Sequence, residues 1–462
     1  MTSESKNHSY AKPPTSVAVF AHVAANGRNE FVPAGMLEHL DQGGDATFTY
    51  GTKYVQRMNP MEIDPVALPL KGEKGGEPRH MAKGLTEFGG IRDAAPDAWG
   101  RRVIENKLKV SGAELPEVAY LIEAGSDRVG ALDVRPGRGS PPISLANSVV
   151  DLERLLMVAD KIESNEQVPD EFLPYFNGLG TAGGARPKAS VRDENGVLWL
   201  VKFPAQKDRA CNAVLEGGAL SLARAVGIRV PPIDVRTVGG KKVLLIRRFD
   251  RYWSSPGEVL PAGRESWESD PGTQHVTAEG RIGLCSAMTL MGLDEYTARN
   301  SSYAAIAQAI RARCTHRYIA RDLQEMFARM VLNVIVNNND DHLRNHAFVY
   351  DMALRGWRLS PLYDVLPMNV VASERYLHLS VGEQGRLATL DNALSKWPAF
   401  FSSREGALMV MHRVWVESRD WLRHFEAFGA TKTDLAYLSG AIRRLSDLAS
   451  PALEAELRGV AQ

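Results

Sequence analysis

The chain contains 462 residues, with 55 basic and 55 acidic side chains, so its formal net charge is zero. This length predicts two or three domains, and the balanced charge neither requires nor excludes a nucleic-acid partner. Only three cysteines occur, without any CxxC pair, which argues against a disulfide framework or a zinc ribbon and favours the cytoplasm. No run of about 18 apolar residues is present, so we expect no membrane span.

The first third of the chain predicts a leader, a small module and a connection. Residues 1–16 are polar, include two prolines and predict a disordered leader. Residues 17–110 predict an α+β module with the strand "SVAVFAHV", the turn "NGRNEF" and a helix in "PDAWGRRVIENKL" that Asp93 or Asp97 could cap. Residues 111–177 predict a mainly helical connection that packs against the next domain.

Residues 178–251 predict a glycine loop on a β-hairpin, followed by a helix and a second hairpin. The loop "GLGTAGGARPK" leads into a strand, the hairpin signal Asn195-Gly196 and a second strand that ends at Lys202. An alanine- and leucine-rich helix then carries Glu216, and two further strands flank Gly239-Gly240. The order is therefore loop, strand, lysine, helix with glutamate and hairpin.

The rest of the chain is predicted to be mostly helical after an insertion. Residues 252–276 are rich in Gly, Pro and Ser and predict a mobile insertion. In residues 277–455 the clearest helix is "RDLQEMFARMVLNVIV", whose apolar residues recur at i, i+3, i+4 and i+7 and predict one buried face. This helix stops where the polar stretch "VNNNDDHLRNHAFVYD" begins.

That polar stretch predicts the chemistry of phosphoryl transfer. Asp340 and Asn345 have the D-x-x-x-x-N spacing of a kinase catalytic loop, in which the aspartate accepts the substrate proton and the asparagine holds magnesium. A strand, a turn and a second strand follow, and then Asp364 in "SPLYDVLP". Carboxylate and amide oxygens suit Mg²⁺. Upstream, Lys202 would pair with the phosphates, and Glu216 would orient that lysine.

Other interpretations of the same residues remain open. The glycine loop alone is more often a plain turn, Lys202 a solvated strand end and Glu216 a surface residue. The cluster after the helix could be a helix C-terminal cap. A metal hydrolase is a further alternative, in which His342 and His346 with Asp340 or Asp341 bind a transition metal.

The sequence resembles the HipA-like serine/threonine kinases, the toxins of bacterial toxin–antitoxin pairs. The resemblance covers residues 17 to 450 and is carried by "GGARPKAS", "LVKFP", "VLLIRRFDR", "DDHLRN", "LSPLYDV" and "PDAWGRR". It implies an α+β, two-lobed protein-kinase-like fold with a largely helical C-terminal lobe and a small N-terminal α+β module. It implies the cofactors ATP and Mg²⁺, a protein substrate, in the best-known cases an aminoacyl-tRNA synthetase, and a HipB-like helix-turn-helix antitoxin that provides most of the contact with operator DNA.

The resemblance also assigns roles to residues of this chain. Asp340 would be the catalytic proton acceptor, Asn345 and Asp364 the metal ligands, and Thr181 would fall where the family carries its autophosphorylated serine. ATP would be bound by Gly183, Gly184, Ala185, Arg186, Pro187, Lys188, Lys202, Arg247, Arg248, Phe249, His342, Asn345, Tyr363 and Asp364, with Glu216 orienting the lysine.

The chain departs from the family in two places. Arg186-Pro187 stand where relatives often have Gln-Glu, and Arg247 replaces an acidic hinge residue. Two rival functions also stay open: a catalytically inactive pseudokinase that acts as a corepressor, against which the intact Lys202, Asp340, Asn345 and Asp364 count, and a small-molecule kinase with a kinase-like core.

Overall fold

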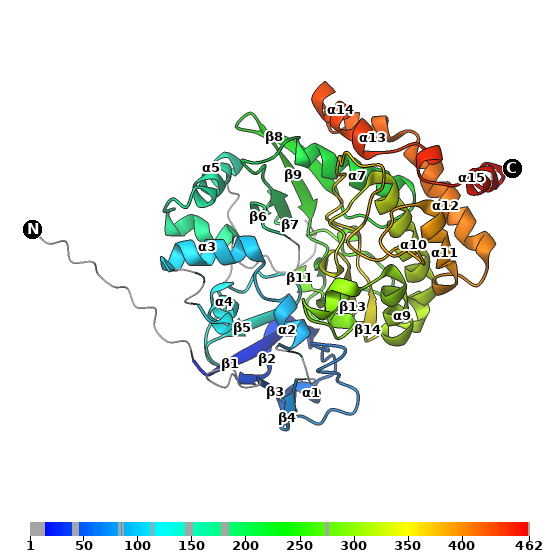
Figure 1. Cartoon of the computed structure of the whole chain (residues 1–462). Helices are drawn as coiled ribbons and strands as arrows, with labels where there is room; N and C mark the ends of the chain where they lie inside the picture. Colours follow the sequence, from blue (N-terminus) through cyan, green and yellow to red (C-terminus); the bar gives the residue numbers. More distant parts are fainter. Residues whose placement is uncertain are drawn as a thin grey trace, which may run out of the picture.

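The computed structural model describes residues 14–38, 46–81, 85, 87–110, 112, 115–143, 151–176, 184–272 and 277–460. Figure 1 shows the N-terminal sheet (blue) at one end of the molecule, a second sheet (green) with helices α3 and α5 beside it, and a helical lobe (yellow to red) that contains the C-terminus. The described chain is thus an α+β structure, as predicted from the sequence.

The N-terminal module is built on a five-stranded sheet with the strand order β4-β3-β2-β1-β5. Its first two strands form an antiparallel hairpin in which Ala25 lies opposite Arg28. The turn residues Asn26 and Gly27 both have positive φ, as a two-residue turn of type I′ requires. The strands are β1 (Ser16–Ala25), β2 (Arg28–Glu38), β3 (Thr47–Tyr50), β4 (Pro78–His80) and β5 (Leu132–Arg135), and the helices are α1 (Thr52–Val55), α2 (Gly89–Asp93), α3 (Ala98–Leu108) and α4 (Glu117–Glu123).

Strand β5 adds to the N-terminal module residues that were predicted to lie in a mainly helical connection, 111–177. It pairs antiparallel with β1, so it belongs to the N-terminal sheet. A strand of four residues is too short to show a clear period in the sequence. Helix α5 (Leu152–Glu163) agrees with the prediction, and it packs on the next sheet through Leu155 and Ile162.

The second sheet has the strand order β6-β7-β9-β8, and it carries the predicted sequence of elements. The predicted turns are both present, because Gly196, Gly239 and Gly240 have positive φ where the chain reverses. Lys202 is the last residue of β7, and Glu216 lies on α7. The elements are α6 (Leu173–Phe176), β6 (Lys188–Arg192), β7 (Leu198–Lys202), α7 (Asn212–Ala225), β8 (Ile233–Val238) and β9 (Lys241–Arg247).

The helical lobe surrounds α10 (Ile319–Val336), which is buried on almost all sides. The sequence predicts one buried face, whereas α7, α9 and α12 enclose the helix. The polar residues of α10 are accommodated because they are bonded: Asp322 accepts from the Leu359 amide at 2.7 Å, and Arg329 binds Glu325. The other elements are β12 (Leu284–Ser286), α8 (Ala287–Leu290), α9 (Tyr303–Arg313), β13 (Ala347–Asp351), β14 (Gly356–Leu359), α11 (Leu390–Ser395), α12 (Arg404–Ser418), α13 (Trp421–Glu426), α14 (Lys432–Ala441) and α15 (Pro451–Gly459).

The stretch 252–276, predicted as an insertion, contains regular structure in its described part. Strand β10 (Arg251–Ser254) pairs antiparallel with β11 (Ala278–Arg281). Ser269 and Asp270 bind the side chain of Arg247 at the end of β9. Residues 273–276 lie outside the described residues.

Among the helices described, none combines the length and apolar character that crossing a membrane demands.

Candidate active site

The loop after α10 turns two adjacent aspartates in opposite directions. Asn337 ends the helix with a left-handed conformation, φ 55°, and its amide binds the Asn333 carbonyl. This tight C-terminal cap starts the loop directly beside the helix end. Asp340 is exposed, and Asp341 is buried.

Asp341 organises the base of the loop. Its Oδ2 accepts hydrogen bonds from the Tyr303 hydroxyl and from Asn333 Nδ2 at 2.7 Å, and it lies 3.0 Å from His346 Nε2. Burial alone would raise the pKa of Asp341, but His346 and Tyr303 hold it below its usual value. The sequence pattern suggests Asp341 only as a metal ligand, since nothing in the sequence distinguishes it from Asp340.

The transition-metal alternative has no ligand set in the described part of the chain. No group of three or more His, Cys, Asp or Glu side chains there could hold a metal ion. His346 is buried against Asp341 instead. The rings of His342 and His378 meet edge-on, with their centroids 5.8 Å apart.

The side chain of Asn345 is oriented so that its amide oxygen is free to bind a ligand. Its Nδ2 donates to the Asp340 carbonyl at 3.0 Å, and the His342 amide donates to the same carbonyl at 2.9 Å. The Oδ1 of Asn345 is buried and accepts no hydrogen bond from the residues described. A buried oxygen without a donor is uncommon in proteins, and it fits the ligand of a cation.

Lys202, Glu216 and Asp364 meet in one cluster, in which the first two side chains are buried and Asp364 is half-buried. The Lys202 ammonium lies 2.7 Å from Glu216 Oε1 and 2.8 Å from Asp364 Oδ1, and the Asp364 amide donates to Glu216 Oε1 at 3.2 Å. Although burial lowers the pKa of an amine, Asp364 and Glu216 raise the pKa of Lys202 above its usual value. Burial would raise the pKa of Asp364, and Lys202 holds it below its usual value. Two carboxylates with one ammonium leave a negative charge, which suits a divalent cation.

A pocket lies beside this cluster. Phe249 and Tyr363 line it and stack on each other with ring centroids 5.8 Å apart. Its other predicted residues are Lys202, Arg247 and Arg248. Five further residues that line the pocket were not predicted from the sequence: Val129, Leu200, Ile246, Asp250 and Leu284. The alternation of β7 and β9 could have pointed to Leu200 and Ile246, whereas no local signal marks Val129.

The described part of the glycine loop is anchored through Lys188. Its ammonium is buried, lying 2.5 Å from Asp97 Oδ2 and 3.0 Å from the Gly184 carbonyl. Arg186 pairs with Asp208 at 2.5 Å, while Ala185 is exposed and Pro187 is buried. Thr181 and Gly183 lie outside the described residues.

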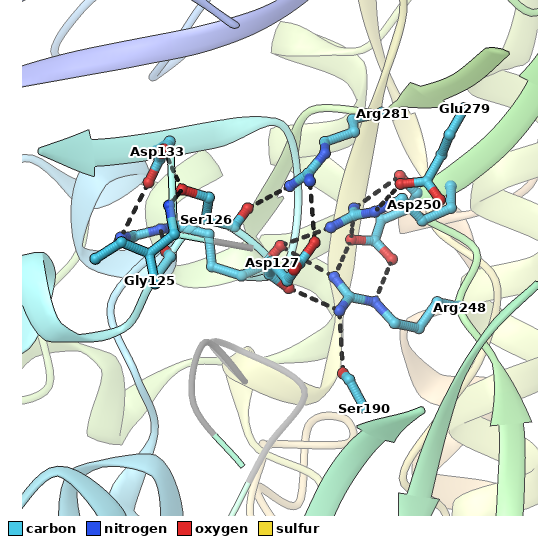
Figure 2. A network of polar contacts seen from close by, with 12 residues as sticks. Gly125, Ser126, Asp127, Asp133, Ser190, Arg248, Asp250, Glu279 and Arg281 are labelled. Carbon is cyan, nitrogen blue, oxygen red and sulfur yellow. Dashed lines mark hydrogen bonds and ion pairs between the residues drawn. The ribbon is translucent and has the colours of Figure 1, made fainter. Parts of the chain in front are cut away.

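The residues after β9 are fixed by their side chains as well as by the sheet. The Arg248 amide donates to the Leu198 carbonyl at 3.0 Å. Its guanidinium binds Asp250 and the carbonyls of Asp127 and Arg128, which belong to the N-terminal module (Figure 2).

Both parts of the chain match models of known domains. Residues 24–135 match the model of the HipA N-terminal domain, and residues 180–422 match that of the HipA-like C-terminal domain. Over 395 residues the chain is 22% identical to "Putative kinase Y4mE" of Sinorhizobium fredii (strain NBRC 101917 / NGR234), covering 81% of this chain and 84% of that protein.

A solved structure shares the fold over nearly the whole chain. The Shewanella oneidensis MR-1 toxin–antitoxin system of HipA, HipB and its operator DNA aligns with a TM-score of 0.62 and 14% identity, covering 96% of both chains. The two-lobed, kinase-like fold predicted from the sequence is therefore confirmed. Because the C-terminal family model alone spans more than half of the sequence, the chain belongs to the HipA-like family of toxin–antitoxin kinases.

Proposed function

We propose that this protein is an ATP- and Mg²⁺-dependent serine/threonine protein kinase that acts in the cytoplasm as the toxin of a toxin–antitoxin pair. The observation that carries the proposal is the cluster of Lys202, Glu216 and Asp364 beside the pocket lined by Phe249 and Tyr363. A lysine held by a helix glutamate is the arrangement that binds nucleotide phosphates in protein kinases.

Each residue of the site has a role in such a reaction. The pocket would take the adenine base between apolar side chains, and Lys202 would bind the phosphates. Asn345 Oδ1 and the Asp364 carboxylate would hold Mg²⁺, which neutralises charge on the phosphate oxygens when it is bound. The exposed carboxylate of Asp340 would accept the proton of the substrate hydroxyl.

Specific observations favour this function over one of its two rivals, the pseudokinase. A chain without phosphate transfer has no need for the exposed carboxylate of Asp340 or for the free Oδ1 of Asn345, so both count against a pseudokinase. A small-molecule kinase shares these features, and only the acceptor of the phosphate separates it from a protein kinase. An aminoacyl-tRNA synthetase is the first candidate substrate that the family suggests.

The test is phosphate transfer from radiolabelled Mg-ATP in a bacterial extract, with the labelled products separated into proteins and small molecules. We expect label on a protein serine or threonine. Label on small molecules alone would support the small-molecule kinase, and no transfer together with intact ATP binding would support the pseudokinase.

We expect the kinase to phosphorylate Thr181 and to lose activity as a result. A phosphate of about −1.5 to −2 charges would repel the ATP phosphates. The phosphate would form an ion pair with Arg186, which is exposed, or with Arg344, which pairs with Glu295. The Lys188 ammonium is instead buried against Asp97. Mass spectrometry after incubation with Mg-ATP should find the phosphate there, in step with lost activity. Full phosphorylation of Thr181 with unchanged activity would contradict this.

We also expect a tight complex with a small helix-turn-helix antitoxin that supplies most of the affinity for operator DNA. The net charge of this chain is zero, so its own non-specific affinity for DNA should be low. In a gel-shift titration at about 150 mM salt, the isolated chain should leave a DNA duplex unshifted, and the complex should shift it. Strong, salt-sensitive binding by the isolated chain would contradict the prediction.

A further inference from the structure

The N-terminal module contacts the nucleotide site at the hinge at the end of β9 (residues 247–250) and at the glycine loop, and it reaches the catalytic loop indirectly, through Ser286 and Ala287. Figure 2 shows the first of these contacts, where the segment 125–130 of the module meets Arg248, Asp250 and Arg281. This segment connects α4 to β5, and Val129 from it lines the pocket.

The contact with the hinge is made by buried arginines that bind backbone carbonyls of the segment. Arg248 donates to the Asp127 carbonyl at 2.9 Å and to the Arg128 carbonyl at 3.0 Å, and Arg251 donates to the Arg128 carbonyl at 3.0 Å and the Gly130 carbonyl at 3.1 Å. Hydrogen bonds from charged donors are stronger than neutral ones, and burial makes their loss costly.

Asp250 binds the same segment from the other direction. Its Oδ2 accepts from the Gly130 amide at 2.8 Å and from Arg248 at 2.6 Å. Burial alone would raise the pKa of Asp250, but Arg248 and Arg251 hold it well below its usual value, so it is ionised at neutral pH. Because Arg248, Asp250 and Val129 all line the pocket, the position of the segment determines the shape of that wall.

Arg281 fixes the segment without reaching the pocket. From β11 it donates to the Ser126 carbonyl at 2.5 Å and to Asp127 Oδ1 at 3.1 Å. On its other side the segment is held inside the module, where Ser126 Oγ donates to Asp133 at 2.6 Å.

Two further contacts reach the lobes on either side of the pocket. In the sheet lobe, Asp97 binds the Lys188 ammonium, and Trp99 Nε1 donates to the Lys188 carbonyl at 3.0 Å. In the helical lobe, Asp93 accepts from the amide of Ser286 at 2.5 Å. The amide of the next residue, Ala287, donates to the carbonyl of His346 at 2.7 Å, directly after the catalytic loop. The module therefore holds both lobes and the hinge between them.

We propose that the N-terminal module is a positioning element of the nucleotide site, so that its docking through residues 125–130 raises the affinity for ATP. The inference rests on the proposed kinase function. Segment 125–130 supplies one apolar wall of the pocket through Val129 and holds the hinge residues that form another. By linkage, a contact that favours nucleotide binding must itself be strengthened when the nucleotide binds.

The first test compares two buried arginines that bind backbone carbonyls. Arg281→Met removes the bonds to Ser126 and Asp127, whereas Arg375→Met removes bonds to the carbonyls of Ala441 and Gly440, far from the module. Calorimetry with Mg²⁺ and the non-hydrolysable analogue β,γ-imido-ATP should show affinity at least about fivefold weaker for Arg281→Met, the lower end of typical coupling between sites. Arg375→Met should bind as the wild type does.

Thermal unfolding identifies a variant that is not folded, and wild-type affinity in folded Arg281→Met protein would overturn the proposal.

The second test needs no variant. Hydrogen exchange of the Gly130 amide, which donates to Asp250, should slow when β,γ-imido-ATP is bound to the full chain. Nucleotide that binds without slowing exchange in residues 125–130 would also overturn it. A wild-type chain that binds no nucleotide would instead contradict the kinase function, and this proposal with it.

Discussion

Replacement of Asp340 by alanine is expected to abolish phosphate transfer while leaving folding and nucleotide binding intact. The carboxylate is exposed, and no hydrogen bond to a described residue holds it, so its removal should cost little stability. A positioned base contributes roughly 10²- to 10⁴-fold to the rate of proton transfer, and the loss of transfer should be of that size. Single-turnover transfer from labelled ATP measures the activity, and calorimetry with β,γ-imido-ATP measures the binding.

The neighbouring aspartate is the matched control for this experiment. Asp341→Ala leaves Tyr303, Asn333 and His346 without their shared acceptor in a buried site. We expect it to lower the free energy of unfolding by roughly 2–4 kcal/mol, measured by urea unfolding. If Asp340→Ala instead destabilised the fold and Asp341→Ala did not, the roles assigned to the two carboxylates would be wrong.

Asp364→Asn is expected to remove the gain in nucleotide affinity that Mg²⁺ provides. The substitution replaces a hard anionic ligand with a neutral amide. Loss of an outer-shell partner already costs a metal site roughly 10- to 100-fold in affinity, and loss of a direct ligand should cost at least as much. Calorimetry with ATP should be run with Mg²⁺ and again with EDTA, because the variant also loses the ion pair with Lys202.

The difference between the two titrations isolates the metal. In the wild type Mg²⁺ should strengthen binding, and in Asp364→Asn it should change binding little. Asp351→Asn is a suitable control, since Asp351 is another aspartate of the helical lobe but binds Tyr318 and the Leu354 amide. An equal Mg²⁺ effect in the wild type and in Asp364→Asn would contradict the assignment of Asp364 as a ligand.

The local elements of the site are determined by the sequence itself. The Asn195-Gly196 turn, the strand that ends at Lys202 and the helix that carries Glu216 all follow from signals between near neighbours in the chain. Asp97 caps α3, as a short polar side chain before a helix predicts, by accepting from the Gly100 amide at 2.9 Å. Polar residues directly after a long buried helix marked the proposed catalytic loop for the same local reason.

What only the tertiary structure decided depends on residues far apart in the chain. The contact between Lys202 and Asp364 spans 162 positions, and that between Gly130 and Asp250 spans 120. No periodic pattern predicts such pairs, because they depend on how separate elements pack. Packing likewise turned Asp341 inward and left Asp340 exposed, although the two are adjacent and identical in type. It also placed Val129 of the N-terminal module in the wall of the pocket, where a valine in a short loop carries no signal of its own.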